Sequence, residues 1–221
     1  MWMFTDLHVH SLHSSGADTP ACLQRLARSM GTELCLCDGV VHEGIASGVE
    51  VHAESRRELL GDIRRHWRKF DFLIVHGGSM EINRCAARDS RVDVLVHPYA
   101  GRRDCGVDTV VAREAARSGV AIGIDLEDVV AARGAERARL LSQIGEILRL
   151  SRKYGFRIAV STGARCRYAL RGTKEVMALL QCIGFTEEEA LAASQHVPRE
   201  LLEKKRLARR EVGRGVRLAQ G

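Results

Sequence analysis

Short apolar runs that alternate with amphipathic segments constrain the fold of this chain more than any other feature. The runs FLIVH, VDVLVH and VAIGID are almost continuously hydrophobic, which is typical of strands buried on both faces of a parallel sheet. The pattern predicts seven strands, over Met3–Val9, Glu33–Asp38, Gly48–Ala53, Phe72–His76, Val92–His97, Val120–Asp125 and Arg157–Ser161.

Segments with a helical spacing of apolar residues lie between most of these strands. Thr19 followed by Pro20 predicts the start of one helix, and others are predicted over Ser55–Lys69 and Gly106–Ser118. The longest covers Glu136–Tyr154 and is followed by a glycine suited to a helix end. The connection between the second and third strands is too short for a crossover helix, so we expect an irregular structure there.

The C-terminal part of the chain is predicted to be helical throughout. Thr186 and Glu189 have the spacing of a capping box, and Pro198 predicts the start of a last, basic helix. The alternation of strands and helices before it fits a (β/α) barrel or an open doubly wound sheet. Because no Gly-x-Gly-x-x-Gly follows the first strand and no P-loop is present, we prefer the barrel.

The length of 221 residues suits one domain. We therefore predict a single α/β domain over residues 1–221, an irregular TIM-like barrel of about seven parallel strands with a helical C-terminal end. From about residue 198 this end forms a basic helix or tail. Residues 199–221 carry eight Lys and Arg against three Glu, and so account for +5 of the net charge of +6. Such a tail attracts phosphate, although a solvated helix end has the same composition.

The seven cysteines are odd in number and irregularly spaced, without a Cys-x-x-Cys pair. This argues against a disulfide framework and a zinc ribbon, and reduced thiols indicate the cytoplasm. The N-terminal residues lack the features of a signal peptide. No apolar stretch has the roughly 18 residues of a membrane span, so we expect no membrane partner.

Polar residues occupy the C-terminal ends of the predicted strands, where parallel barrels carry their functional residues. They are Asp6, His8, His10, Asp38, Glu50, His76, His97, Asp125 and the run 161–165. His8 and His10 point to the same side of their strand because side chains alternate along it. Nitrogen and oxygen ligands from several strand ends could converge on a metal ion. Histidines that satisfy one another and backbone carbonyls at a barrel mouth remain the alternative.

These motifs resemble known families. DLHVHS (6–11) resembles the polymerase-and-histidinol-phosphatase (PHP) superfamily of metal-dependent phosphoesterases, and the whole chain is more similar to the archaeal ribonuclease P protein component 3 family. The stretches that carry the second resemblance include GVEVHAES (48–55), FDFLIVHGGSMEINRCAARD (70–89), VDVLVHPYAGRRDCGVD (92–108), GIDLEDVV (123–130) and LRLSRKYGFRIAVSTGAR (148–165). Within them HPYAGRRDCG is particularly specific.

The resemblance implies a PHP-like subunit of the ribonucleoprotein that removes the 5′ leader from precursor tRNA. The active site would belong to the ribonuclease P RNA and its Mg²⁺ ions, and proteins of this kind would neutralise phosphates and stabilise the RNA. The implied direct partner is ribonuclease P protein component 2, in paired heterodimers. Precursor tRNA would be the substrate of the whole particle.

Departures from the phosphoesterase pattern decide what we expect of the isolated chain. PHP enzymes place Asp-x-His after the last strand, where this chain has Ser161-Thr162-Gly163-Ala164-Arg165, and Cys37-Asp38-Gly39 lacks the usual histidine after Asp. A cation beside a divalent ion costs Coulomb energy. We therefore interpret the histidine cluster as a remnant and expect no catalytic residue, no metal ligand and no tightly bound cofactor. A PHP-type phosphoesterase or nuclease with a rebuilt metal site is the alternative.

Arginines after the strands are the candidate RNA ligands, because the guanidinium fork matches phosphate oxygens. The predicted set is Arg84, Arg88, Arg102, Arg103, Arg165, Arg167 and Arg171, with Lys204, Lys205, Arg206, Arg209 and Arg210 in the tail. We expect the loop and helix arginines to gather at the barrel mouth or its rim. With 5% aromatic residues, phosphate and shape recognition of folded RNA is favoured over base stacking.

Overall fold

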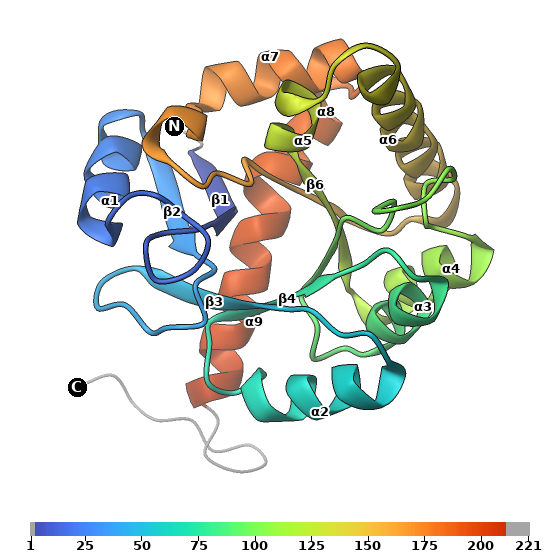
Figure 1. Cartoon of the computed structure of the whole chain (residues 1–221), viewed down its shortest axis with the longest axis horizontal. Helices are drawn as coiled ribbons and strands as arrows, with labels where there is room; N and C mark the ends of the chain where they lie inside the picture. The colour runs from blue at the N-terminus through green and yellow to red at the C-terminus, as the bar shows by residue number, and fades with distance from the viewer. Residues whose placement is uncertain (1–2, 211–221) are drawn as a thin grey trace.

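Seven parallel strands form one curved sheet in the order of the chain (Figure 1). The structure is a computed structural model that describes residues 3–210, with the side chains of residues 3–204. The strands are β1 (Phe4–Val9), β2 (Thr32–Leu36), β3 (Ala46–Val51), β4 (Phe72–His76), β5 (Val94–Val96), β6 (Ala121–Asp125) and β7 (Ile158–Ser161). All seven predicted strands are confirmed, with ends that differ by at most two residues.

Helices pack around this sheet, and the last of them enters its interior. They are α1 (Pro20–Ser29), α2 (Arg56–His66), α3 (Met80–Arg88), α4 (Thr109–Ser118), α5 (Leu126–Ala131), α6 (Gly134–Tyr154), α7 (Thr173–Ile183), α8 (Glu187–Leu191) and α9 (Val197–Arg210). Thr19 caps α1 as predicted, and Thr186 and Glu189 form the predicted capping box. The helix predicted from Gly106 begins at Thr109 instead, because the Asp108 side chain accepts a hydrogen bond from the backbone N–H of Val111.

The connection between β2 and β3 is irregular, as the sequence predicts. No helix lies in it, and the ladder between the two strands has only the pairs Cys35–Ala46 and Leu36–Ser47. Among residues 3–210, no helix has the length and apolar character needed to span a bilayer.

The barrel is nearly closed, and its seam lies between the edge strands β1 and β7. The buried carboxylate of Asp6 accepts hydrogen bonds from the backbone N–H of Thr162, at 2.9 Å, and from its hydroxyl, at 2.5 Å. The backbone N–H of His10 donates to the carbonyl of Ala164, at 2.9 Å. A buried side chain thus joins the two edges that no strand ladder connects.

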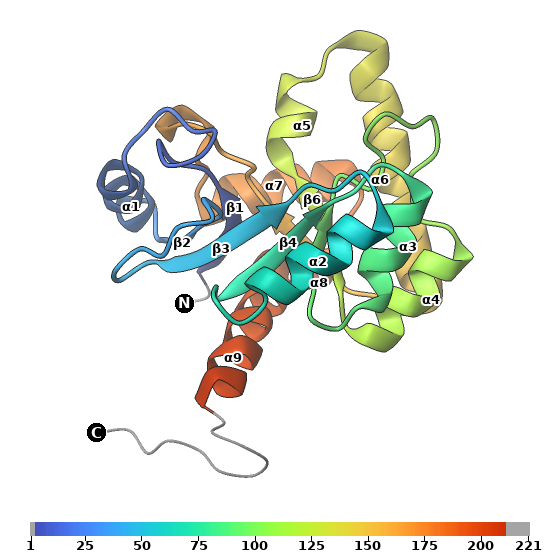
Figure 2. The ribbon, with the colours of Figure 1, turned by 60° about the horizontal axis from the view of Figure 1, so that its bottom comes forward.

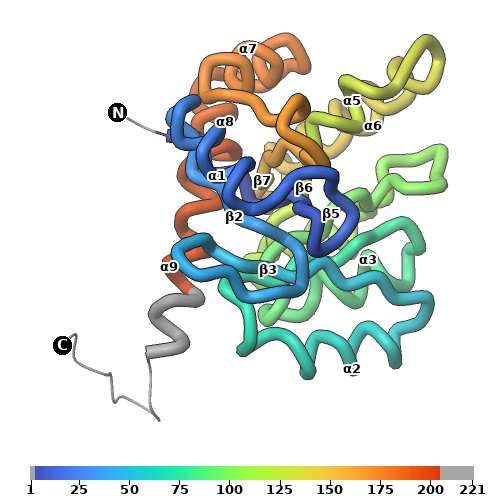
Figure 3. The backbone as a smooth tube through the Cα atoms, turned by 60° about the vertical axis from the view of Figure 1, so that its left-hand side comes forward, coloured from blue at the N-terminus to red at the C-terminus, as the bar shows by residue number. Residues whose placement is uncertain are grey.

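The last helix fills the interior of the barrel. Side chains of β1, β4 and α9 form one buried cluster that includes Leu7, Phe72, Ile74, Val197, Leu201 and Leu202. Figures 2 and 3 show α9 leaving the barrel away from α5 and the start of α6. The start of the basic C-terminal helix, residues 197–202, is therefore part of the barrel core, a role that its basic composition does not indicate. The predicted RNA ligands begin after it, at Lys204.

No break in the helical path precedes α9. A π-helical segment, η2 (Ala192–His196), joins α8 to α9, and the backbone N–H of Val197 bonds to the carbonyl of Ala192, five residues earlier. Because Pro198 lacks an N–H group, it cannot bond to a carbonyl of the preceding turn. The wider π turn accommodates the missing hydrogen bond, so the helix continues through Pro198. The sequence analysis expected a helix to begin at this residue.

Candidate functional site at the barrel mouth

Two histidines and a glutamate meet inside the mouth of the barrel. His8 lies in β1, His10 follows that strand, and Glu50 lies in β3. The Nε2 atoms of His8 and His10 are 3.1 Å apart. Glu50 Oε2 lies 3.5 Å from the first and 3.7 Å from the second. The relative exposures of His8 and His10 are 2% and 4%, so this group is shielded from solvent.

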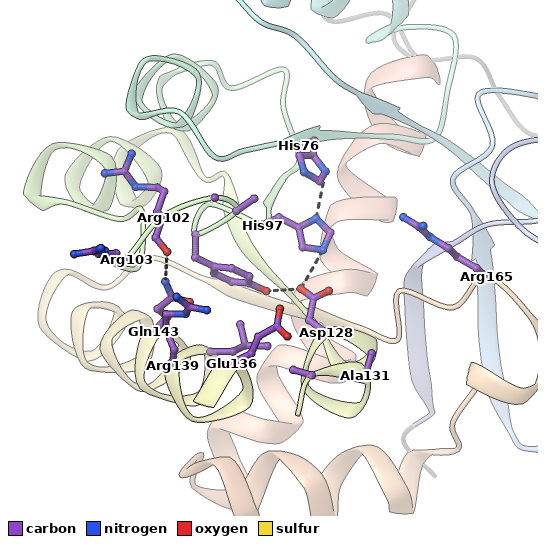
Figure 4. Close-up of a pocket in the computed structure, with 15 residues that line it drawn as sticks. His76, His97, Arg102, Arg103, Asp128, Ala131, Glu136, Arg139, Gln143 and Arg165 are labelled. Carbon is purple, nitrogen blue, oxygen red and sulfur yellow. Dashed lines mark hydrogen bonds and ion pairs between the residues drawn. The ribbon is translucent and has the colours of Figure 1, made fainter. Parts of the chain in front are cut away.

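A second group shares the same glutamate. His76 Nδ1 lies 2.9 Å from Glu50 Oε1 and 3.3 Å from His97 Nδ1. On its other side, His97 Nε2 lies 3.0 Å from Asp125 and 3.2 Å from Asp128 (Figure 4). The predicted convergence of strand-end nitrogen and oxygen atoms is thus present for six of the predicted residues: His8, His10, Glu50, His76, His97 and Asp125.

Two other acidic residues at the strand ends form hydrogen bonds with neighbouring loops instead. Asp6 bonds to Thr162 across the seam. Asp38 accepts hydrogen bonds from the backbone N–H and hydroxyl of Ser11 and from the hydroxyl of Ser14. Both carboxylates hold loops, so neither adds an oxygen to the histidine cluster.

The backbone of His97 is held in an unusual conformation. Its φ of 50° is the one positive value at a non-glycine position among the described residues, and such a conformation is sparsely populated. The buried Asn83 amide donates to the carbonyls of Pro98 and Gly106, both at 2.9 Å. At Gly106 a Cβ would lie 1.8 Å from the Pro98 carbonyl oxygen, so only glycine fits. The buried Asn83 therefore holds the loop that carries His97 at the mouth.

Two carboxylates set the protonation of the histidines. Burial alone would lower the pKa of His8, but Asp125 and Glu50 outweigh it and raise that pKa to about 10. The pKa of His97 is likewise raised to about 10, by Asp125 against the effect of burial. Burial and the neighbouring cationic His8 lower the pKa of His10 to about 4. Despite burial, His8 and His97 lower the pKa of Asp125. The pKa of Glu50 is likewise lowered, by its hydrogen bonds with His52, His76 and His8.

The loop after β7 brings a cation to the mouth. Arg165 lines a cavity of about 330 Å³ together with His8, His10, His97 and Asp125. Its exposed side chain forms no hydrogen bond or ion pair with any residue that the structure describes. The loop after β7 therefore presents a guanidinium that is available to an anion.

A larger cavity of about 810 Å³ adjoins the first one. Arg102, Arg103 and Arg165 line it, as does Arg139 of α6 (Figure 4). The side chain of Arg102 is held by Asp104, at 2.6 and 2.7 Å, whereas Arg103 is exposed and has no such bond within the described part of the chain. Asp104 is thus the partner of Arg102 and not of the adjacent Arg103.

Arg139 was missed by the sequence interpretation. It lies on the exposed face of a long amphipathic helix, where a lone cation has no distinguishing pattern. Only the return of α6 past the mouth places it beside the loop arginines.

The remaining predicted arginines do not all lie at the mouth. Arg84 pairs with Asp108, and Arg167 pairs with Asp18 near the start of α1, so both are at the rim but engaged. Arg88 lies in the last turn of α3, away from the mouth. The carbonyl of Arg171 accepts a bond from Thr32 at the first residue of β2, at the opposite end of the barrel. The expectation that all seven gather at the mouth or rim is therefore wrong for Arg88 and Arg171.

In the tail, the structure describes the side chain of Lys204 alone among the predicted residues, and it is exposed. The side chains of Lys205, Arg206, Arg209 and Arg210 lie outside the described part of the chain.

The fold and the mouth define a class: an irregular (β/α) barrel of the PHP type with a histidine–carboxylate cluster and an arginine in its last strand-end loop. The model of the family "RNase P subunit p30" matches residues 39–210. The chain belongs to this family.

Curated relatives and solved structures agree with this assignment. Ribonuclease P protein component 3 of Methanothermobacter thermautotrophicus is 38% identical over 174 residues, which are 79% of this chain and 71% of that protein. An archaeal ribonuclease P determined with mature tRNA contains a chain with a TM-score of 0.73 at 24% identity, covering 98% of this chain and 90% of that one. Histidinol phosphate phosphatase from Lactococcus lactis, solved with zinc, L-histidinol and phosphate, has a TM-score of 0.53 at 15% identity over 91% of this chain and 93% of its own. The last two show the fold, and the predicted barrel is confirmed.

Proposed function

We propose that this chain is a protein subunit of ribonuclease P, the particle that removes the 5′ leader from precursor tRNA. The observation that carries the proposal is the family match over residues 39–210, supported by relatives named ribonuclease P protein component 3. In this proposal the chain binds and stabilises the ribonuclease P RNA. The chemistry belongs to that RNA and its Mg²⁺ ions, and precursor tRNA is the substrate of the whole particle.

The proposal extends to the protein partners and the location. We infer that ribonuclease P protein component 2 is the direct partner, in paired heterodimers, as the family resemblance implies. A cytoplasmic location is favoured by the seven cysteines, none of which forms a disulfide within the described residues.

RNA contact at the mouth rests on guanidinium groups without a carboxylate partner. Arg103, Arg139 and Arg165 are exposed, line the 810 Å³ cavity and form no ion pair with a described residue. Paired arginines such as Arg102 are already neutralised and must break an ion pair to reach a phosphate. The unpaired three are therefore the side chains best placed to replace counterions on the RNA.

Arg103→Ala should weaken RNA binding without lowering thermal stability. Arg102→Ala should lower thermal stability and leave RNA binding largely unchanged. Arg103 has no internal bond to lose, but Arg102 fixes Asp104 and donates to the Gly78 carbonyl at 3.4 Å. Binding of the ribonuclease P RNA, followed across a salt series, should show a slope smaller by about one in Arg103→Ala. Melting curves of both variants provide the second measurement.

Arg117→Ala is the matched control, because Arg117 lies on α4 and pairs with Glu114. It should bind RNA as the parent does. If Arg103→Ala has the parent's salt slope, the mouth loop does not contact RNA.

The alternative of a PHP-type phosphoesterase is not favoured by the loop after β7. Of that loop, Gly163 and Arg165 reach the smaller cavity, and neither supplies an anionic ligand. A site for phosphoryl transfer on two metal ions needs a full set of hard ligands at close spacing.

The isolated protein, supplied with Zn²⁺, Mn²⁺ or Mg²⁺, should therefore not turn over phosphomonoesters or RNA. The measurement is the release of phosphate or of RNA fragments over hours. Turnover that is present in the parent and lost in a His8→Ala, His10→Ala double variant would establish the rival function.

A further inference from the structure

We propose that an unpaired base of RNA stacks on the ring of Tyr168 and that Arg165 binds a phosphate beside that base. Both residues belong to the segment between β7 and α7, which begins at the mouth of the barrel. The inference rests on the proposed RNA-binding function and names the feature of RNA that this segment recognises. For the chain as a whole, the sequence analysis favoured phosphate and shape recognition over base stacking. The placement of Tyr168 points to stacking at this one position.

The ring of Tyr168 faces solvent. It is 83% exposed, the largest value for a large hydrophobic side chain in the described part of the chain. The two other tyrosines have partners within the fold. Tyr99 is buried and donates to Asp128 at 2.8 Å, and the Tyr154 hydroxyl lies 3.4 Å from that of Thr109. Because a buried aromatic side chain removes about 150–250 Å² from water, packing within the chain does not account for the position of Tyr168.

The backbone on both sides of this ring is fixed. Before it, the backbone N–H and the Nε of Arg167 donate to the two carboxylate oxygens of the buried Asp18, both at 2.8 Å. After it, Leu170 is buried, and Arg171 Nη1 donates to the carbonyls of Tyr168 and Leu170 at 2.7 and 2.9 Å. A ring on a rigid turn loses little conformational freedom when a ligand binds, so more of the contact energy appears as affinity.

The charge of the segment fits a polyanion. Residues 165–174 carry three arginines and one lysine, and no acidic residue. Arg167 and Arg171, both predicted RNA ligands, use their guanidinium groups to hold the turn. Arg165 has no such bond within residues 3–204 and is exposed at the mouth. An exposed aromatic ring three residues from an unpaired arginine offers one surface for a base and one charge for a phosphate.

The competing explanation is that the ring inserts into a pocket of a protein partner. Protein-binding sites are marked by contiguous exposed apolar surface. Within residues 163–174, Tyr168 is the one exposed large apolar side chain, and its neighbours in the chain are cationic or small. A base needs only one face of one ring, and every base has such a face. The surroundings of Tyr168 therefore favour RNA over protein.

The test uses the full-length protein and a single-stranded RNA of about ten nucleotides that contains 2-aminopurine, with a duplex of the same length for comparison. The fluorescence of 2-aminopurine reports stacking, and a salt series reports phosphate contacts. Tyr168→Ala should weaken binding of the single strand by about 5–100-fold, abolish the fluorescence change and leave the salt slope unchanged. Tyr168→Phe keeps the ring and should bind as the parent does. Arg165→Ala should instead reduce the salt slope by about 0.7.

Tyr154→Ala is the matched control, because Tyr154 is the last residue of α6, at the end of the barrel where β7 begins. It should bind the single strand as the parent does. Melting curves show that each variant is folded, and Tyr168→Ala should melt as the parent does because its ring is exposed.

Three results would overturn the inference while the proposed function stands. In the first, the parent binds RNA and Tyr168→Ala has the parent's affinity and fluorescence change. In the second, Tyr168→Ala weakens single-strand and duplex binding equally. In the third, it loses affinity for a partner protein and none for RNA. A parent that binds neither RNA at any salt concentration would contradict the proposed RNA-binding function itself, and the inference with it.

Discussion

Leu201→Ala should lower the free energy of unfolding by about 2–5 kcal/mol, the range for removing a large apolar side chain from a packed core. Leu201 is 1% exposed and belongs to the cluster inside the barrel that contains Phe72 and Ile74. The loss should be near the upper end of this range, because a rigid ring of strands cannot collapse into the cavity. Denaturant unfolding of the isolated protein measures the effect.

Glu203→Ala is the control for this prediction. Glu203 is exposed on the same helix, so its removal should change the free energy of unfolding by less than about 0.5 kcal/mol. Equal stabilities of parent and Leu201→Ala would mean that α9 does not pack inside the folded barrel.

Asp6→Ala should cost about 2–4 kcal/mol, because it removes the carboxylate that joins the two edges of the sheet. The backbone N–H and the hydroxyl of Thr162 would lose their acceptor in a buried place, and each such loss costs about 1–3 kcal/mol. Asp6→Asn keeps one acceptor for the N–H group, and the Thr162 hydroxyl can turn to accept from the amide. The Asn variant should therefore remain close to the parent in stability.

The parent and Asp6→Asn should also differ in how their free energy of unfolding depends on pH. Burial raises the pKa of Asp6 to about 7, from 3.8, so folding favours its protonated form. Its contribution to stability is fully present below about pH 4 and is lost as pH rises through about 7. Relative to Asp6→Asn, which cannot titrate there, the parent should become less stable between these values. A constant difference across this range would show that Asp6 titrates normally.

The strands and the barrel could be predicted from the sequence because each depends on a local pattern. The apolar run of Phe72–His76 forms β4 with the same bounds, and the Thr186 capping box depends on residues three apart. The convergence of His8, His10 and Glu50 also followed, since parallel strands bring their C-terminal ends to one edge.

Features that depend on three-dimensional packing could not be predicted. The basic character of residues 199–210 obscures the apolar face of α9, which among the described side chains contributes Val197, Leu201 and Leu202 to the interior cluster. Asp6 belongs to the motif DLHVHS, yet its carboxylate bonds to Thr162 across the seam, a contact between residues 156 positions apart that no local pattern indicates. Arg102 and not Arg103 pairs with Asp104. Which of the two adjacent arginines forms this ion pair depends on the conformation of the loop, which the sequence does not show.

The measurement that tests the central claim most directly is cleavage of precursor tRNA by ribonuclease P reconstituted from its RNA and proteins, with and without this chain. The account predicts that adding the chain, with protein component 2, lowers the Mg²⁺ concentration needed for cleavage and raises the rate. The Arg103→Ala, Arg165→Ala double variant should retain only part of this gain. A fully assembled particle whose rate and Mg²⁺ requirement are the same with and without the chain would contradict the assignment.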